Sequence, residues 1–315
     1  MMTLHVRTPT WESRPLSSAL DGLVFLKMEA LQPIGSFKIR GIGYACQASC
    51  EVGANRLVCS SGGNAGYAVA YSGHKLGVDV TVVVPKTTPH YVRETIGKEK
   101  ATVIEHGESW DDAHAYASQL SKQDGAAYIH PFDDTRIWRG HASIVEELAE
   151  EGFKPDTIVL SVGGGGLLCG VLEGLHKVGW TDLPVVAVET EGAASLSASV
   201  AAGHLVTLNE ISSIATTLGA RTVAQNALAW TRRHPIQPWT VSDRAAVDAC
   251  LRFANDHRVL VEPACGAALS VIYDRALPLK KSRSVMVMVC GGAGVNLSLL
   301  SEWDRQVRRN PSPKP

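Results

Sequence analysis

The segment Thr157-Ile158-Val159-Leu160-Ser161-Val162-Gly163-Gly164-Gly165-Gly166 decides the fold class of this chain. Its first part, residues 157–161, is mostly apolar and β-branched, which is typical of a parallel strand buried on both faces. The four glycines at 163–166 predict a sharp turn, and residues 167–178 have a helical pattern. A buried strand that turns directly into a helix indicates an α/β protein.

The same order of strand and helix recurs along the chain. We predict further short, mostly apolar strands at residues 56–59, 80–84, 185–188 and 285–289. We predict helices in longer segments between and beside them, at residues 66–76, 110–122, 140–151 and 243–256. The alternation predicts an α/β fold with mostly parallel sheets.

The composition limits the class of protein. The chain has 315 residues, of which 45% are hydrophobic and 19% charged, so it can bury a large core and is not disordered. Its net charge of -1 argues against nucleic acid or an anionic membrane as the main partner. No stretch approaches the roughly 18 apolar residues of a membrane span. We expect the basic run at 305–309 to be a solvated tail.

The cysteines and the first residues indicate a cytoplasmic protein. The seven cysteines are odd in number and none forms a CxxC pair, so we interpret them as reduced, mostly buried thiols. No cluster of cysteine and histidine has the spacing of a metal site. Residues 1–20 lack the apolar core of a signal peptide.

Three of the predicted strands run into glycine-rich loops, at residues 60–66, 163–166 and 291–294. In open α/β sheets, ligands bind at the carboxyl ends of parallel strands. The three loops therefore predict one site that is assembled from distant parts of the chain.

The loop 163–166 exposes four backbone N–H groups at the start of a helix, an arrangement that favours an anion. This predicts a phosphate cradle, and the alternative is a tight strand-to-helix turn. No Lys-Ser/Thr pair follows, so the loop is not a Walker A motif. A dinucleotide site such as that for NAD is a weaker alternative, which Glu189 keeps open because it ends the next strand, where a ribose-binding acid would lie.

Two further segments have the residue types of a binding site. Residues 60–66, Ser-Ser-Gly-Gly-Asn-Ala-Gly, predict a second anion nest that suits a substrate carboxylate, or else a polar turn with Asn64 as helix cap. Lys38 lies between Phe37 and Ile39. A desolvated lysine has a lowered amine pKa and forms a Schiff base readily, whereas the alternative is an ordinary surface lysine.

Together these segments resemble the fold-type II pyridoxal-phosphate enzymes, and most closely the serine dehydratase and serine dehydratase-like family. The matching segments cover nearly the whole chain in order, and as a set they are highly specific. They are 35–41 (GSFKIRG), 60–66 (SSGGNAG), 131–134 (PFDD), 137–143 (IWRGHAS), 161–169 (SVGGGGLLC), 261–268 (VEPACGAA) and 289–292 (VCGG).

The resemblance implies a role for each site residue. Lys38 would form the Schiff base with pyridoxal 5'-phosphate and then remove the Cα proton of the substrate. The cofactor phosphate would be bound by Gly163, Gly164, Gly165 and Gly166, and the cofactor ring by Phe37, Asn64 and Cys290. The substrate carboxylate would be bound by Ser61, Gly62, Asn64 and Ala65. A monovalent cation, potassium, would be bound by Glu189, Ala193, Ser195, Leu218 and Ala220.

The activity that the resemblance implies is β-elimination, which converts L-serine to pyruvate and ammonia and L-threonine to 2-oxobutyrate. A neutral thiol at Cys290 would not hold the ring nitrogen protonated, which suits prompt loss of the β-hydroxyl. Gly62 argues against racemisation, because a serine racemase of this fold has a serine hydroxyl at that place. Two alternatives stay open: a β-replacement transferase similar to cysteine synthase, and a cofactor-binding protein with little turnover.

The resemblance also implies two domains, each with a mostly parallel, twisted sheet flanked by helices. The large cofactor-binding domain would contain residues 1–38 and 147–315, and the small mobile domain, residues 39–146, would close over the substrate. A homodimer without a regulatory domain, active in amino-acid catabolism and gluconeogenesis, is expected. Three features depart from the family pattern: Thr217 replaces a small apolar residue beside the ring, Gly62 stands where many relatives have alanine, and the loop 291–296 is longer than usual.

Overall fold

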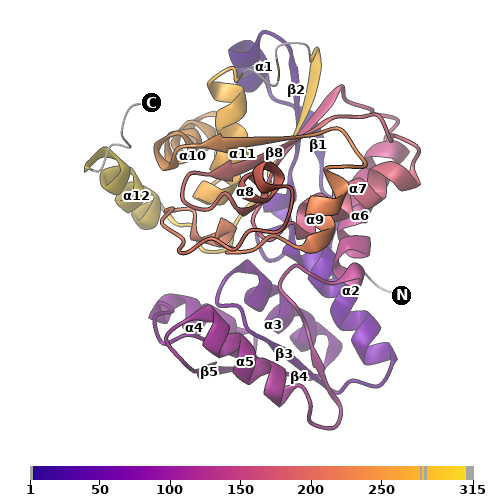
Figure 1. Ribbon diagram of the computed structural model, residues 1–315, viewed down its shortest axis with the longest axis vertical. Helices are drawn as coiled ribbons and strands as arrows, with labels where there is room; N and C mark the ends of the chain where they lie inside the picture. The colour runs from indigo at the N-terminus through magenta and orange to yellow at the C-terminus, as the bar shows by residue number, and fades with distance from the viewer. Residues whose placement is uncertain (1–2, 277–278, 280–281, 310–315) are drawn as a thin grey trace.

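The chain folds into two lobes, each built on one β-sheet (Figure 1). The computed structural model describes residues 3–276, 279 and 282–309. One sheet has six strands in the order β1-β2-β10-β7-β8-β9, and the other has four strands in the order β5-β4-β3-β6. All strand pairs are parallel except β1 with β2. The predicted α/β fold with mostly parallel sheets is therefore confirmed.

The six-stranded sheet contains β1 (Thr10–Glu12), β2 (Leu23–Lys27), β7 (Thr157–Ser161), β8 (Val185–Thr190), β9 (Ile236–Val241) and β10 (Ser284–Met288). The helices of its lobe include α1 (Arg14–Leu20), η1 (Glu29–Leu31), α7 (Gly166–Lys177), α8 (Ser195–Ala202), η2 (Thr216–Leu218), α9 (Gln225–Trp230), α10 (Asp243–His257), α11 (Pro263–Tyr273) and α12 (Leu297–Arg309).

The four-stranded sheet contains β3 (Arg56–Cys59), β4 (Asp79–Val84), β5 (Thr102–Glu105) and β6 (Ala126–Tyr128). Its lobe carries α3 (Asn64–Leu76), α4 (His90–Lys98) and α5 (Trp110–Leu120). Two longer helices, α2 (Lys38–Glu51) and α6 (Thr135–Glu150), complete the fold.

Helices α2 and α6 join the two lobes. They pack against each other, α2 also packs on α3, and α6 packs on α7. Because the same buried core includes Leu57 of the small sheet and Ile158 of the large one, the lobes share apolar packing. The predicted domain boundary at 146/147 falls within α6, and the boundary at 38/39 falls at the start of α2.

The central strand β7 shows why the opening segment folds as predicted. Every residue of β7 is buried, because strands lie on both sides of it and helices cover the sheet. The chain then turns through the glycines into α7, with Gly165 at φ +90°, a conformation that favours glycine. The carboxyl end of β7 is therefore fixed beside the amino end of a helix.

One expectation from composition is wrong. The basic run at 305–309 is not a tail but the last part of α12, which packs against α10 and buries Leu300 and Val307. An apolar residue at helical spacing within the run explains the difference. None of the helices in the part of the chain that the structure describes has the length and apolarity needed to span a bilayer.

Candidate active site

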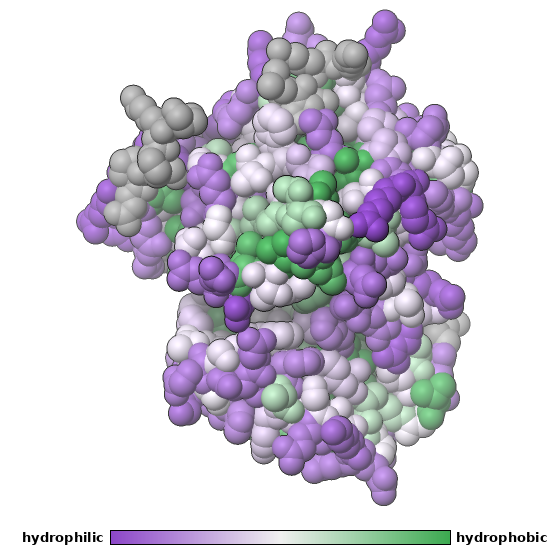
Figure 2. Space-filling model, viewed as in Figure 1, coloured by the Kyte–Doolittle hydropathy of each residue, from purple (hydrophilic) through white to green (hydrophobic). Residues whose placement is uncertain are grey.

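A cavity lies where the two lobes meet, and the surface is hollowed between the lobes on the face shown in Figure 2. Its empty volume is about 520 Å³, part of which is open to solvent. The lining comes from the loops that follow β6, β7 and β10, from the starts of α2, α3, α7 and α11, and from η2. The lining residues are Phe37, Lys38, Asn64, Phe132, Ser161, Val162, Gly163, Gly164, Gly165, Gly166, Leu167, Thr217, Leu218, Glu262, Ala264, Cys290 and Gly291.

The glycine loop forms one wall of this cavity and has no room for side chains. A Cβ on Gly164 would overlap the Phe132 ring, and one on Gly165 would lie 2.7 Å from the Cβ of Ala227. The first N–H groups of α7 have no partner within the helix, and the helix dipole adds positive potential there. This end of the cavity therefore fits a phosphate group.

The alternative of a dinucleotide site loses its supporting residue. The Glu189 carboxylate accepts hydrogen bonds from the backbone N–H groups of Leu196 (2.7 Å) and Ser197 (2.8 Å). It also accepts one from the Ser197 hydroxyl at 2.6 Å. Glu189 thus caps the start of α8 and does not present its carboxylate to a ribose.

Lys38 is the first residue of α2 and lines the cavity, so it is not an ordinary surface lysine. Its Nζ donates a hydrogen bond to the Pro131 carbonyl at 2.8 Å. Burial lowers the pKa of Lys38 to about 8, although Cys59 and Cys290 oppose the shift. A larger fraction of neutral amine results, and the neutral amine is the nucleophilic form.

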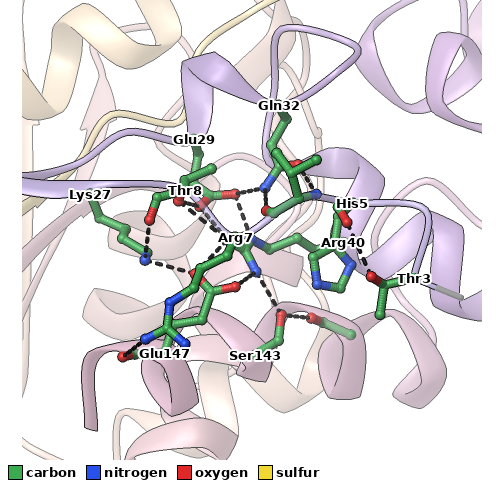
Figure 3. Close-up of polar contacts among 12 residues, drawn as sticks. Thr3, His5, Arg7, Thr8, Lys27, Glu29, Gln32, Arg40, Ser143 and Glu147 are labelled. Atoms are coloured by element: carbon green, nitrogen blue, oxygen red, sulfur yellow. Dashed lines mark hydrogen bonds and ion pairs between the residues drawn. The ribbon is translucent and has the colours of Figure 1, made fainter. Parts of the chain in front are cut away.

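A buried ionic network fixes the first turn of α2 (Figure 3). Arg40 binds Glu29 of η1 with Nε and Nη2, at 2.7 and 2.8 Å, and binds Glu147 of α6 with Nη1 and Nη2, at 2.6 and 2.9 Å. Lys27 of β2 also contacts Glu147, at 2.7 Å. Because Arg40 lies two residues after Lys38, the network fixes the backbone of the lysine relative to η1, β2 and α6.

Asn64 is the first residue of α3, and its side chain does not cap that helix; the N-cap residue is Gly63. The Asn64 amide nitrogen donates to Glu262 Oε2 at 3.0 Å, and its oxygen accepts from the backbone N–H of Ala293 at 2.7 Å. These two bonds fix the orientation of the amide. Its second N–H remains to serve an acceptor in the cavity.

Glu262 is a cavity residue that the sequence reasoning missed. Besides the Asn64 bond, its carboxylate accepts from the Thr217 hydroxyl at 3.0 Å and from the Gly294 N–H at 2.8 Å. Burial raises the pKa of Glu262, and the three hydrogen bonds oppose that shift. The available signal was a lone carboxylate between apolar residues, Val261 before it and Pro263 after it.

Cys290 lines the cavity next to Cys265. The hydrogen bond with the Cys265 thiol raises the pKa of Cys290 well above its ordinary value, and burial raises it further. Cys290 is therefore a neutral thiol, which provides at most a weak hydrogen bond to a ligand.

The residues predicted to bind the substrate carboxylate lie together in one short segment of the chain. Ser61, Gly62 and Ala65 are absent from the cavity lining, although their neighbour Asn64 belongs to it. They form the turn from β3 into α3, where the Gly63 N–H donates to Ser61 Oγ at 3.3 Å. No side chain caps α3, so its first N–H groups remain available for a carboxylate.

The five predicted cation ligands lie in two segments, one around the end of β8 and one around the end of η2. In the first segment, Glu189 is the penultimate residue of β8, Ala193 lies in the loop after it, and Ser195 is the first residue of α8. In the second, Leu218 is the last residue of η2 and Ala220 follows two residues later. The Ser195 hydroxyl is buried and has no hydrogen-bond partner among the residues that the structure describes. Such an oxygen is suited to a cation, since a buried polar atom without a partner is unfavourable.

Comparisons with known proteins identify the family of the chain. The profile of a family described as "Pyridoxal-phosphate dependent enzyme" matches residues 1–291. The chain is 47% identical to "L-serine dehydratase/L-threonine deaminase" of Mus musculus over 99% of this chain and 98% of that protein. It is 48% identical to "Serine dehydratase-like" of Homo sapiens, over 93% and 92% of the two chains.

Among solved structures, a fungal L-serine ammonia-lyase from Rhizomucor miehei superposes with a TM-score of 0.92 at 38% identity, covering 97% of this chain and 99% of that one. A maize serine racemase has a TM-score of 0.87 at 26% identity, over 97% and 93% of the chains. The chain therefore belongs to the family of pyridoxal-phosphate-dependent enzymes of fold-type II, among the serine dehydratases and serine dehydratase-like proteins.

Proposed function

We propose that the protein is an L-serine ammonia-lyase that uses pyridoxal 5'-phosphate and also acts on L-threonine. One observation carries the proposal: Lys38, with its lowered pKa, lines the same cavity as the glycine loop 163–166, Asn64 and Cys290. The relatives named above for serine and threonine chemistry support the choice of substrate.

The residues of the cavity fit the cofactor. When bound, pyridoxal phosphate supplies the electron sink that weakens the bonds at the substrate Cα. Lys38 would hold the cofactor through its amine, and residues 163–166 would bind the phosphate. Phe37 would pack on the ring, Asn64 would donate its second N–H to the ring hydroxyl, and the Cys290 thiol would face the ring nitrogen.

The chain's own residues would then act on the substrate. The N–H groups at the start of α3, with Ser61, Gly62, Asn64 and Ala65, would bind the carboxylate and orient the Cα–H bond. Lys38 would remove the Cα proton, for which an amine with a pKa near 8 is suited. Loss of the β-hydroxyl as water, followed by hydrolysis of the released enamine, converts L-serine to pyruvate and ammonia.

A keto-acid assay of the cofactor-loaded protein tests this proposal, with L-serine, L-threonine and D-serine in potassium buffer. We expect pyruvate and ammonia in equal amounts from L-serine, 2-oxobutyrate from L-threonine and no product from D-serine. Lys38→Ala should abolish turnover, whereas Lys154→Ala, at a half-exposed site paired with Asp182, should not. Cysteine from O-acetylserine and sulfide, without pyruvate from L-serine, would instead establish a β-replacement enzyme.

We also infer a potassium site at Glu189, Ala193, Ser195, Leu218 and Ala220. The buried, unpartnered hydroxyl of Ser195 supports it. We expect L-serine turnover to be faster in potassium than in sodium at equal ionic strength, and Ser195→Ala to remove the difference. Equal rates of the unaltered enzyme in the two salts would contradict the site.

The division into a domain of residues 1–38 and 147–315 and one of residues 39–146, the homodimer and the cytoplasmic location stay predictions from the resemblance. Sedimentation velocity of the holoenzyme tests the dimer. Limited proteolysis with and without L-serine tests closure of the small domain, which should protect the junction between the lobes when substrate is bound.

A further inference from the structure

Three polar side chains form a continuous set of hydrogen bonds at Ser60, the residue just before the loop 61–65. Ser60 Oγ lies 2.6 Å from the Tyr128 hydroxyl, and that hydroxyl lies 2.7 Å from Nδ1 of His114. Ser60 is completely buried, and the other two side chains are partly buried. The reaction described above gives none of the three a role.

The sheet topology brings these residues together. Ser60 directly follows β3 and Tyr128 ends β6, and the two strands are parallel neighbours in which Val58 pairs with Tyr128. The carboxyl ends of the strands are therefore level, and the tyrosine side chain reaches the first residue of the loop. His114 comes from α5, which packs on both strands.

Aromatic side chains hold the imidazole of His114 in place. Trp110 stacks on it with ring centroids 4.8 Å apart and planes at 8°. The His130 ring stands almost perpendicular to it, at 79° and 6.1 Å. With its ring fixed by both neighbours, His114 presents Nδ1 to Tyr128 in a single orientation.

The protonation state of Tyr128 determines which hydrogen bonds its hydroxyl can make to Ser60 and His114. Burial raises the pKa of Tyr128, and the thiol of Cys59 adds to the shift, so the phenol is neutral. A neutral phenol donates one hydrogen bond and accepts others, so it pairs with Ser60 and His114 at the same time. The Ser60 side chain is thereby tied to the sheet at the residue where the loop 61–65 begins.

We propose that Tyr128 and His114 are positioning residues that hold Ser60, and with it the loop 61–65, in the conformation that binds the substrate carboxylate. The proposal rests on the proposed function, which assigns the carboxylate to this loop. It predicts that loss of the Tyr128 hydroxyl weakens binding of ligands that have a carboxylate and leaves other amines unaffected.

Two non-reacting ligands test this selectivity. L-alanine has the carboxylate but no β-hydroxyl to eliminate, and L-alaninol is the matching amine without the carboxylate. Binding of each to the holoenzyme is followed by the change in absorbance of the bound cofactor. Since one neutral hydrogen bond is lost, Tyr128→Phe should raise the dissociation constant of L-alanine about two- to tenfold and leave that of L-alaninol unchanged.

Kinetics and matched variants separate positioning from general damage. In Tyr128→Phe, KM for L-serine should rise by the same factor while kcat stays close to that of the unaltered enzyme. His114→Phe should reproduce the effect, and His114→Asn, which keeps a polar atom near the place of Nδ1, should restore much of the affinity. Tyr116→Phe on the same helix, whose ring stacks on His106, should change neither ligand.

The outcomes distinguish this inference from the proposed function. If Ser61→Ala weakens L-alanine selectively but Tyr128→Phe affects neither ligand, the inference fails and the carboxylate site stands. If the unaltered holoenzyme binds L-alanine no more tightly than L-alaninol, the carboxylate assignment itself is wrong. Equal weakening of both ligands by Tyr128→Phe would show a structural role only and would also overturn the inference.

Discussion

At the scale of single residues, Glu262 connects two of the three features that depart from the family pattern, Thr217 and the loop after Cys290. Its carboxylate accepts hydrogen bonds from the Thr217 hydroxyl and the Gly294 N–H. The neighbouring Ala293 N–H donates a hydrogen bond to the side-chain oxygen of Asn64. The Thr217 hydroxyl thus has a hydrogen-bond partner in Glu262. The loop after Cys290 provides the backbone N–H groups that bind Asn64 and Glu262. Both departures therefore serve to hold Asn64, the residue predicted to contact the cofactor ring.

Replacing Glu262 by glutamine tests this role. Asn64 and Thr217 donate to one oxygen of Glu262, and Gly294 donates to the other. In glutamine an NH₂ group, which cannot accept, replaces one of these oxygens, so at least one of the three hydrogen bonds is lost. Since hydrogen bonds to charged groups are worth about 1.5–3 kcal/mol, we expect cofactor affinity to fall roughly 10- to 100-fold. Fluorescence titration of the apoprotein with pyridoxal phosphate measures this.

A matched control removes only one of the three bonds. Thr217→Val keeps the shape of the side chain and deletes its hydroxyl, so its loss of affinity should be smaller than that of Glu262→Gln. A Glu262→Gln protein with unchanged affinity and an unchanged cofactor absorbance would show that Asn64 is held without the carboxylate.

At the scale of elements, the segments with a strong local pattern were predicted well. Strands β3 and β7 have the predicted bounds, and α3, α5, α7 and α10 begin within two residues of their predicted starts. The short edge strand β1 and the strand β6, which has three residues, have too few side chains for a periodic pattern. Their place depends on pairing with β2 and β3, which local sequence does not specify.

The turn from β7 into α7 is the element that local sequence predicts best, and it has a direct test. In Gly164→Ala the new Cβ would overlap the Phe132 ring, so the ring or the loop must shift, and both line the cavity where we place the phosphate. We expect cofactor affinity to fall at least about tenfold, the loss that one displaced hydrogen bond produces. Equilibrium dialysis with pyridoxal phosphate measures it.

The control for this glycine is Gly97 in α4. A Cβ there has no atom within 4 Å, and alanine favours a helix over glycine by about 1 kcal/mol. Gly97→Ala should leave cofactor affinity unchanged and raise stability slightly. If Gly164→Ala binds the cofactor as well as Gly97→Ala does, the cradle is not where the phosphate binds.

The anchoring of α2 is a second property of an element, and it depends on Arg40. Its guanidinium lies between Glu29 and Glu147, and both Arg40 and Glu29 are completely buried. Arg40→Met would leave Glu29 buried without its counter-charge, so we expect the free energy of unfolding to fall by about 3–5 kcal/mol. Urea denaturation monitored by circular dichroism measures the change.

A double variant distinguishes loss of charge balance from loss of packing. Arg40→Met combined with Glu29→Gln removes one charge of each sign and leaves Lys27 paired with Glu147, so it should recover part of the stability. If the double variant is less stable than Arg40→Met alone, packing by the arginine stem, not its charge, holds α2.

At the scale of the whole molecule, the site exists only because the lobes bring distant segments together. Asn64 and Glu262 are 198 residues apart in sequence, and Lys38 and Pro131 are 93 apart. The sequence indicated which loops would meet, because each follows the carboxyl end of a predicted parallel strand, although β3 belongs to one sheet and β7 and β10 belong to the other. It did not indicate that Glu262 bridges them, since a hydrogen bond between distant segments leaves no periodic pattern.

The packing of the lobes also predicts how stability depends on pH. Burial lowers the pKa of His141 well below its ordinary value and that of His130 to about 4, with help from nearby positive charges. In the unfolded chain both histidines take up a proton near pH 6.5. The folded state therefore binds fewer protons below pH 6.5, and acid favours unfolding.

We expect the free energy of unfolding to fall by about 1–2 kcal/mol for His130 between pH 7 and pH 5, with a further loss from His141. Urea denaturation at pH 5, 6 and 7 measures this change.

A variant of His130 serves as the test of its contribution. His130 Nδ1 accepts hydrogen bonds from the backbone N–H groups of Phe132 and Asp133, so His130→Asn keeps an acceptor there but cannot titrate. This variant should show a shallower dependence on pH, whereas His204→Asn, at an exposed site, should follow the unaltered protein. Identical dependence in all three proteins would mean that His130 is protonated as readily in the folded protein as in the unfolded chain, and that the junction of the lobes is more open to water than its packing indicates.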